Sequence, residues 1–110
     1  MDLVNELNML TKELSYAITM MQKYAREKSE AERNYKIALR QEALKLRSEK
    51  NMAVTLIDKV VYGVSEVADK RFKRDVAEAM YETSKENINV LKTNIRILET
   101  QLKLEYGEKN

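Results

Sequence analysis

The stretch LVNELNMLTKELSYAITMMQKYA, residues 3–25, places apolar side chains alternately four and three positions apart. This row consists of Leu3, Leu7, Leu10, Leu14, Ala17, Met21 and Tyr24. The same alternation continues to about Glu42, and Lys28 is its first polar interruption. Because an α-helix turns once every 3.6 residues, the row lies on one side of a helix and predicts a long contact with a second helix. We therefore predict one helix from about residue 2 to about residue 47, with Asp2 as its N-cap.

The composition of the chain agrees with long, uninterrupted helices. Its 110 residues contain no proline and two glycines, Gly63 and Gly107, and 35% of them are charged. Proline and glycine are the residues that disrupt helices most strongly, so their scarcity is typical of long helices and coiled coils. The length indicates a single domain that spans residues 1–110.

The segment between the predicted long helices, about residues 48–64, combines a turn with a crowded apolar stretch. Asn51 suits a helix C-terminus or a turn, because asparagine tolerates left-handed backbone angles. The stretch VTLIDKVVYG, 54–63, then predicts a short hinge helix that is capped by Thr55 and ends at Gly63. Its density of valine, leucine and isoleucine predicts that this helix folds back and covers the end of a helical hairpin.

A second long helix is predicted from about residue 65 to about residue 106, stopping at Gly107. The row that we expect to face the first helix consists of Ala68, Phe72, Val76, Ala79, Thr83, Ile88, Leu91, Ile95, Leu98 and Leu102. Val90, Ile97 and Leu104 recur every seven residues on another side, which predicts a contact with a second copy of the chain. The predicted fold is all-α: a long antiparallel helical hairpin with a short hinge helix, dimerising into a four-helix bundle or coiled coil.

The residue types argue against catalysis and metal binding. The chain has no histidine and no cysteine, which removes the commonest general base and the commonest zinc ligands. Glu78 and Glu82 share a helix side, but carboxylates without histidine do not complete the di-metal sites of helical bundles. No glycine-rich phosphate loop is present, and no apolar run is long enough to cross a membrane. We therefore predict no cofactor, no metal, no enzymatic activity and no membrane partner.

Basic residues gather near the predicted hinge, most densely in KRFKR, residues 70–74. The candidate contact residues for a partner protein or a nucleic acid are Lys50, Lys70, Arg71, Lys73 and Arg74. Nearby acidic residues nearly balance them, and the whole chain carries a net charge of only +2. Phosphate-binding surfaces usually show a larger one-sided excess of positive charge, and Phe72 is expected to contact the first helix rather than a base. A protein partner is thus the leading hypothesis, and a nucleic-acid-binding accessory protein that uses the basic hinge end is the alternative.

Four blocks of the sequence carry a resemblance to a known family. They are AERNYKIALRQEALKLRSE (31–49), VTLIDKVVYG (54–63), RFKRDVAEAMY (71–81) and INVLKTNIRILETQL (88–102). Taken together they resemble a family of small helical, coiled-coil proteins encoded in the early, DNA-metabolism gene blocks of phages and prophages of Gram-positive bacteria. Where members of that family often have a basic residue before the hinge glycine, this chain has Tyr62.

The resemblance implies a non-catalytic phage accessory protein of the host bacterial cytoplasm. Such a protein would bind the phage replication or recombination machinery, or would inhibit a host factor such as a defence protein. The resemblance implies no catalytic residues.

Overall fold

A computed structural model describes residues 2–107 of the chain, which form helices and turns and no strand. The two long helices are α1 (Leu3–Glu49) and α3 (Ser65–Leu102). Between them lie the short helix α2 (Val54–Val60) and a 3-10 turn (Val61–Gly63), and a π-helical turn (Lys103–Gly107) follows α3. The predicted all-α fold, with two long helices and a short hinge helix, is confirmed.

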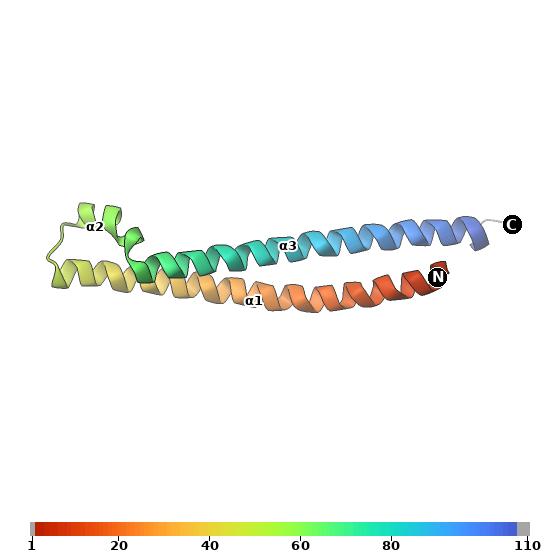
Figure 1. Ribbon diagram of the computed structural model, residues 1–110, viewed down its shortest axis with the longest axis horizontal. Helices are drawn as coiled ribbons and strands as arrows, with labels where there is room; N and C mark the ends of the chain where they lie inside the picture. Colours follow the sequence, from red (N-terminus) through yellow and green to blue (C-terminus); the bar gives the residue numbers. More distant parts are fainter. Residues whose placement is uncertain (1, 108–110) are drawn as a thin grey trace. The chain divides into compact units, whose positions relative to one another are not determined.

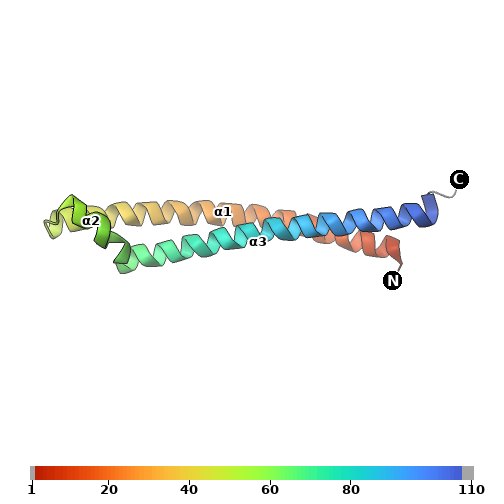
Figure 2. The same ribbon diagram turned by 90° about the horizontal axis from the view of Figure 1, so that it is seen from above.

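The chain divides into two compact units, each with its own core. The terminal unit consists of Met1–Lys23 and Tyr81–Asn110, and the hinge unit consists of Tyr24–Met80. In each unit a segment of α1 lies beside a segment of α3 and runs in the opposite direction (Figures 1 and 2). This antiparallel pairing is the arrangement expected of a helical hairpin.

The core of the terminal unit is a short run of the α1–α3 contact. Its buried residues are Ala17, Ile88 and Leu91, and Leu10, Leu14 and Met21 pack against them. The four α1 residues of this core, Leu10, Leu14, Ala17 and Met21, belong to the row of alternating apolar positions that the sequence predicts for the first helix. The predicted contact between the two long helices is therefore observed in this unit.

The core of the hinge unit forms where α2 folds back onto the two long helices. Its buried residues are Tyr35, Ile57, Val61 and Val67, and Leu39, Ala43, Leu46, Met52 and Val64 pack against them. Ile57 and Val61 thus fill the end of this unit, as the crowded apolar stretch predicts. The rest of that stretch is not buried, because Leu56 and Val60 are exposed on another side of α2 and Val54 is exposed at its start.

The ends of α1 follow the expected capping chemistry. The Asp2 Oδ1 accepts a hydrogen bond of 2.8 Å from the backbone N–H of Asn5, which satisfies one of the unpaired donors of the first helical turn. At the other end Asn51 takes a positive φ of 52°, and the backbone N–H of Met52 then donates to the Leu46 carbonyl over 3.1 Å. The predicted roles of Asp2 and Asn51 are confirmed.

The start of α2 differs from the prediction. The helix begins at Val54, and the Ala53 carbonyl accepts the backbone N–H groups of Leu56 and Ile57, both over 3.0 Å. Thr55 therefore lies inside the first turn, and no side chain caps this helix. The predicted Thr55 cap is wrong because Ala53, two residues earlier, already takes the N-cap position.

The side of α3 that faces α1 also differs from the prediction in its first half. The buried and half-buried positions of α3 other than Lys85, which we call the inner row, are Val67, Lys70, Arg74, Ala77, Tyr81, Ser84, Ile88, Leu91, Ile95, Leu98 and Leu102. From Ile88 onward the prediction is confirmed. Before Ile88 it is wrong, since Val67 is 0% exposed whereas Phe72, predicted as a contact with the first helix, is 69% exposed.

The prediction fails before Ile88 because the side of α3 that faces α1 is set by regular spacing and not by apolar residues. The inner row keeps steps of four and three throughout, and these steps lead back from Ile88 through Ser84 and Arg74 to Val67. The predicted row followed apolar residues instead and needed a step of five between Thr83 and Ile88. A straight helix keeps its phase, so α3 places polar residues in the α1 contact and leaves Phe72 and Val76 exposed.

Candidate interaction surfaces

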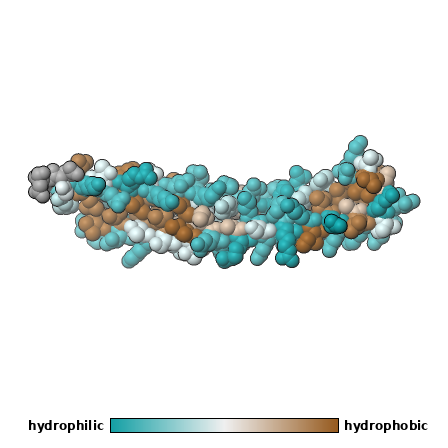
Figure 3. All heavy atoms as spheres, turned by 180° about the vertical axis from the view of Figure 1, so that it is seen from behind, coloured by the Kyte–Doolittle hydropathy of each residue, from teal (hydrophilic) through white to brown (hydrophobic). Residues whose placement is uncertain are grey.

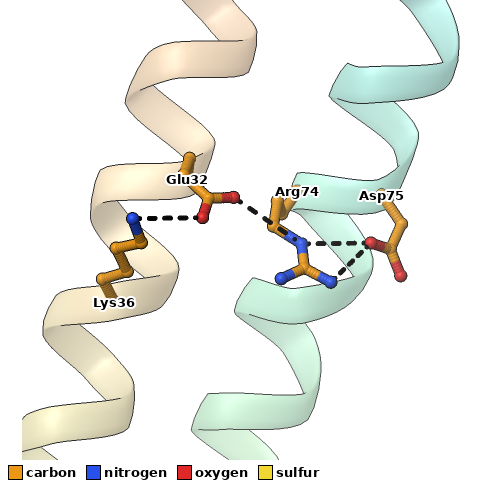
Figure 4. A network of polar contacts seen from close by, with 4 residues as sticks. All are labelled: Glu32, Lys36, Arg74 and Asp75. Carbon is orange, nitrogen blue, oxygen red and sulfur yellow. Dashed lines mark hydrogen bonds and ion pairs between the residues drawn. The ribbon is translucent and has the colours of Figure 1, made fainter.

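Arg74 lies in the inner row of α3 and connects it to α1 in the hinge unit (Figure 4). Its Nε lies 3.8 Å from a carboxylate oxygen of Glu32 on α1, and its Nη2 donates a 2.9 Å hydrogen bond to Asp75. The guanidinium carbon lies 4.5 Å from the centroid of the Tyr35 ring, within range of a cation–π contact. Glu32 also pairs with Lys36 over 3.5 Å, so four charged residues and one ring form a continuous network.

The charge state of Arg74 follows from these contacts. The hydrogen bond to Asp75 raises the pKa of Arg74 above its ordinary value, and the negative charges of Asp75 and Glu32 act in the same direction, while partial desolvation opposes them. The guanidinium therefore stays protonated at any ordinary pH. Its position and partners make Arg74 a link between α1 and α3 within the hinge unit.

The other four basic candidates do not form one positive face with Arg74. Lys70 also belongs to the inner row, with its Nζ 3.9 Å from Glu66. Lys70 and Lys73 line one groove together, and the acidic Glu27 and Glu30 balance them there. Arg71 lies over the Tyr62 ring at 5.7 Å, and Lys50 is exposed just after the end of α1. KRFKR thus distributes its charges between the α1 contact, a mixed groove and the hinge.

Exposed apolar side chains occur on α2 and in the turn after it: Leu56 and Val60 share one side of α2, Val54 lies at its start, and Tyr62 lies in the turn. We call Val54, Leu56, Val60 and Tyr62 the hinge surface; all four are exposed, and Val54 is 61% exposed. Ile57 and Val61, which lie between them in sequence, are buried in the core of this unit and hold α2 in place. Because Arg71 contacts Tyr62, the hinge surface has a basic residue at its border.

A second apolar surface lies on α3 in the terminal unit. Val90, Ile97 and Leu104 are 54%, 52% and 67% exposed, so they face away from the core as the sequence predicts for a dimer contact. They belong to a row of positions alternately four and three apart, which we call the outer row. Its members are Thr83, Asn87, Val90, Asn94, Ile97, Gln101 and Leu104. Figure 3 shows one face of the molecule, on which hydrophobic side chains reach the surface of this unit.

Two grooves between α1 and α3 extend the outer row onto α1. One is lined by Glu6, Met9, Leu10, Glu13, Asn94, Ile97 and Leu98. The other is lined by Lys12, Glu13, Tyr16, Ala17, Asn87 and Leu91. Met9 and Tyr16 are exposed and thus share the side of the unit on which the outer row lies.

No metal site or membrane-spanning helix is found in residues 2–107. No three acidic residues there lie close enough together to hold a metal ion. Neither α1 nor α3 contains an apolar stretch of the length that a bilayer requires. Glu78 and Glu82 are both exposed on α3, as expected of a solvated helix side.

Comparison of the chain with protein families, with curated proteins and with solved structures found no match. The resemblance to phage proteins therefore stays a prediction.

Sequence reasoning missed the Arg74 network and the exposure of the hinge surface. The position of Arg74 in the α1 contact could have been found by counting back from Ile88 in strict steps of four and three, which reaches Arg74. The exposure of the hinge surface has a weaker signal in the sequence. Leu56 and Val60 are four residues apart, and so are Ile57 and Val61, so α2 has two apolar sides of which a short helix can bury only one.

Proposed function

We propose that this protein acts without catalysis, by binding another protein through the hinge surface. The observation that carries the proposal is the exposure of four large apolar side chains between residues 54 and 62, on an element whose opposite side is anchored in a core. Burying apolar surface gains about 25 cal/mol per Å². Large apolar side chains that are left exposed close together on one short element are therefore candidates for a site where proteins bind one another.

The border of the hinge surface favours a protein over a nucleic acid. It carries both signs of charge, with Asp58 and Lys59 exposed on α2 and Arg71 over Tyr62. An apolar centre with a mixed polar rim is the usual anatomy of a protein–protein interface. A phosphate backbone would need a one-sided positive face, and the five basic candidates are not arranged as one.

The resemblance to phage proteins suggests where to look for the partner. It points to the replication or recombination machinery of a phage, or to a host protein that the chain would inhibit, in the bacterial cytoplasm. This part of the proposal is supported by the resemblance alone.

The experiment compares the tagged chain with Leu56→Lys and with the matched control Thr55→Lys. Both variants add one lysine to an exposed position of α2, but only the first interrupts the hinge surface. Proteins captured from a lysate of a Gram-positive bacterium, with and without phage infection, are quantified by mass spectrometry. A true partner is retained by the wild type and by Thr55→Lys and falls at least tenfold with Leu56→Lys. The affinity of the purified partner is then measured by isothermal titration calorimetry. We expect the wild type and Thr55→Lys to bind it equally and Leu56→Lys to bind it at least tenfold more weakly.

Two outcomes would overturn the proposal. In the first, every captured protein binds Leu56→Lys as well as the wild type. In the second, single- or double-stranded nucleic acid binds in a low-salt gel shift, binds Leu56→Lys at least as well because of the added charge, and is released steeply by salt. That result would favour the nucleic-acid-binding alternative.

A further inference from the structure

The outer row of α3 is free of charge from Thr83 to Leu104, in a chain of which 35% is charged. Its seven positions are all exposed, and apolar or threonine side chains alternate with the amides of Asn87, Asn94 and Gln101. Steps of four and three are the spacing by which one helix packs against another. The α1 contact already uses the inner row, so α3 carries a second helix-packing row that none of residues 2–107 covers.

The neighbours of the outer row make it suitable for burial. The Thr93 hydroxyl donates to the Asn89 carbonyl and the Thr100 hydroxyl donates to the Arg96 carbonyl, each over 3.0 Å. Both donors are therefore satisfied within α3, and covering them would leave no hydroxyl hydrogen unpaired. Met9 and Tyr16 add exposed apolar area from α1 through the two grooves. We call the outer row together with Met9 and Tyr16 the terminal face.

The exposed area of the chain supports a partner of substantial size. The chain exposes 8265 Å². A compact folded monomer of 12.9 kDa would expose about 6300 Å². The excess of about 2000 Å² is spread over the whole chain, and a standard interface would cover roughly 800 Å² on each partner. In the terminal unit the buried residues are Ala17, Ser84, Ile88 and Leu91, so a second pair of helices would supply most of its core.

We propose that the terminal face binds the terminal face of a second copy of this chain, so that two hairpins form a four-helix arrangement. The outer row itself carries no charge, and the charged residues that line its two grooves, Glu6, Lys12 and Glu13, include both signs. Its amides donate and accept hydrogen bonds equally well, so the row is complementary to itself. A two-fold symmetric contact requires such a self-complementary patch. The proposal does not depend on the hinge surface or on its partner.

The first experiment measures mass in solution for the wild type, Ile97→Lys and Asn89→Lys. Both variants place one lysine on α3, but Asn89 lines a groove with Ile18 and Lys92 and does not belong to the terminal face. In sedimentation equilibrium at micromolar concentration, the wild type and Asn89→Lys are expected at twice the chain mass of 12.9 kDa. Ile97→Lys is expected at the mass of one chain. A monomeric wild type, or an Ile97→Lys variant as dimeric as the wild type, would overturn the proposal.

A second measurement keeps the test valid if the lysine variant fails to fold. Because the chain has no cysteine, a single introduced thiol reports on one position only. The thiol of Ile97→Cys is expected to react with a maleimide at least tenfold more slowly at high protein concentration than at low concentration, since dimerisation covers it. The thiol of Asn89→Cys is expected to react at the same rate at both concentrations. Equal behaviour of the two thiols would rule out the terminal face as the contact.

Discussion

The two units use the same spacing of the inner row but fill it with different chemistry. In the terminal unit the row is apolar from Ile88 to Leu102, and two helices alone bury three apolar residues. In the hinge unit the row contains Lys70 and Arg74, and α2 supplies the additional apolar side chains that close a core. A pair of helices therefore needs a third layer, and the hinge unit finds that layer in its own chain.

The largest expected effect comes from charging the centre of the hinge core. Val67→Asp places a carboxylate where the native side chain is 0% exposed and lined by Tyr35, Ile57 and Val61. We expect a loss of about 4 kcal/mol or more in the free energy of unfolding, since a buried charge there has no partner. Urea denaturation followed by circular dichroism measures it. The neighbouring Ala68→Asp, at an exposed position, is the control and should change stability by about 0.5 kcal/mol.

The next effect tests how much α2 contributes to the hinge core. Ile57→Ala deletes a buried side chain and should cost about 2–5 kcal/mol. Leu56→Ala deletes a similar side chain from the exposed hinge surface and should cost much less. If the two variants melt at the same temperature, α2 is not packed against the long helices and the comparison between the units fails.

A parallel pair of variants probes the terminal unit. Leu91→Ala removes one of its three buried apolar residues and should also cost about 2–5 kcal/mol. Val90→Ala removes an exposed side chain of the outer row, so its effect depends on whether a second copy covers it. We expect the cost of Val90→Ala to be measurable at high protein concentration and to vanish at high dilution, in thermal melts over a concentration series. A cost independent of concentration would contradict self-association through this row.

The smallest effect concerns the polar part of the inner row. Arg74→Met removes the Glu32 and Asp75 contacts while keeping a side chain that covers Tyr35, so the melting temperature should change less than in the core variants. A raised pKa stabilises the folded state at pH below the ordinary arginine pKa, and this contribution is lost only when pH rises through the raised value. The difference between wild type and Arg74→Met should therefore stay constant from pH 7 to about pH 10. A difference that disappears over that range would show that Arg74 is not the charged link.

How much of the fold could be predicted depended on whether apolar residues marked the helix phase. They do so in residues 3–25 and 88–102, and there both the helices and their facing sides are confirmed. In residues 67–84 the apolar residues do not mark the side of α3 that faces α1. Phe72 and Val76 suggest that they lie on this side, but both are exposed. The prediction that Thr55 caps α2 failed for a more local reason, since the backbone carbonyl of Ala53 already closes the first turn of α2.

The candidate surfaces were predictable to different degrees. Val90, Ile97 and Leu104 could be placed on the exposed side of α3 because their phase is fixed by Ile88 and Leu91. The exposure of Leu56 and Val60 could not be predicted, because sequence alone does not say which side of a short apolar helix meets the core. Lys70 and Arg74 lie on a different side of α3 from Arg71. This could not be predicted, because the apolar residues before Ile88 indicate the wrong side of α3 for the contact with α1.

The Arg74 network also restricts how the two long helices can be aligned. A slide of α3 along α1 by seven residues, about 10.5 Å, would keep the steps of four and three matched and would be cheap for the apolar positions alone. The same slide would carry Arg74 two helical turns away from Tyr35 and Glu32, its two partners on α1, while Asp75 would move with it on α3. Within the hinge unit the polar stretch of the inner row therefore disfavours a slide that the apolar positions alone would tolerate.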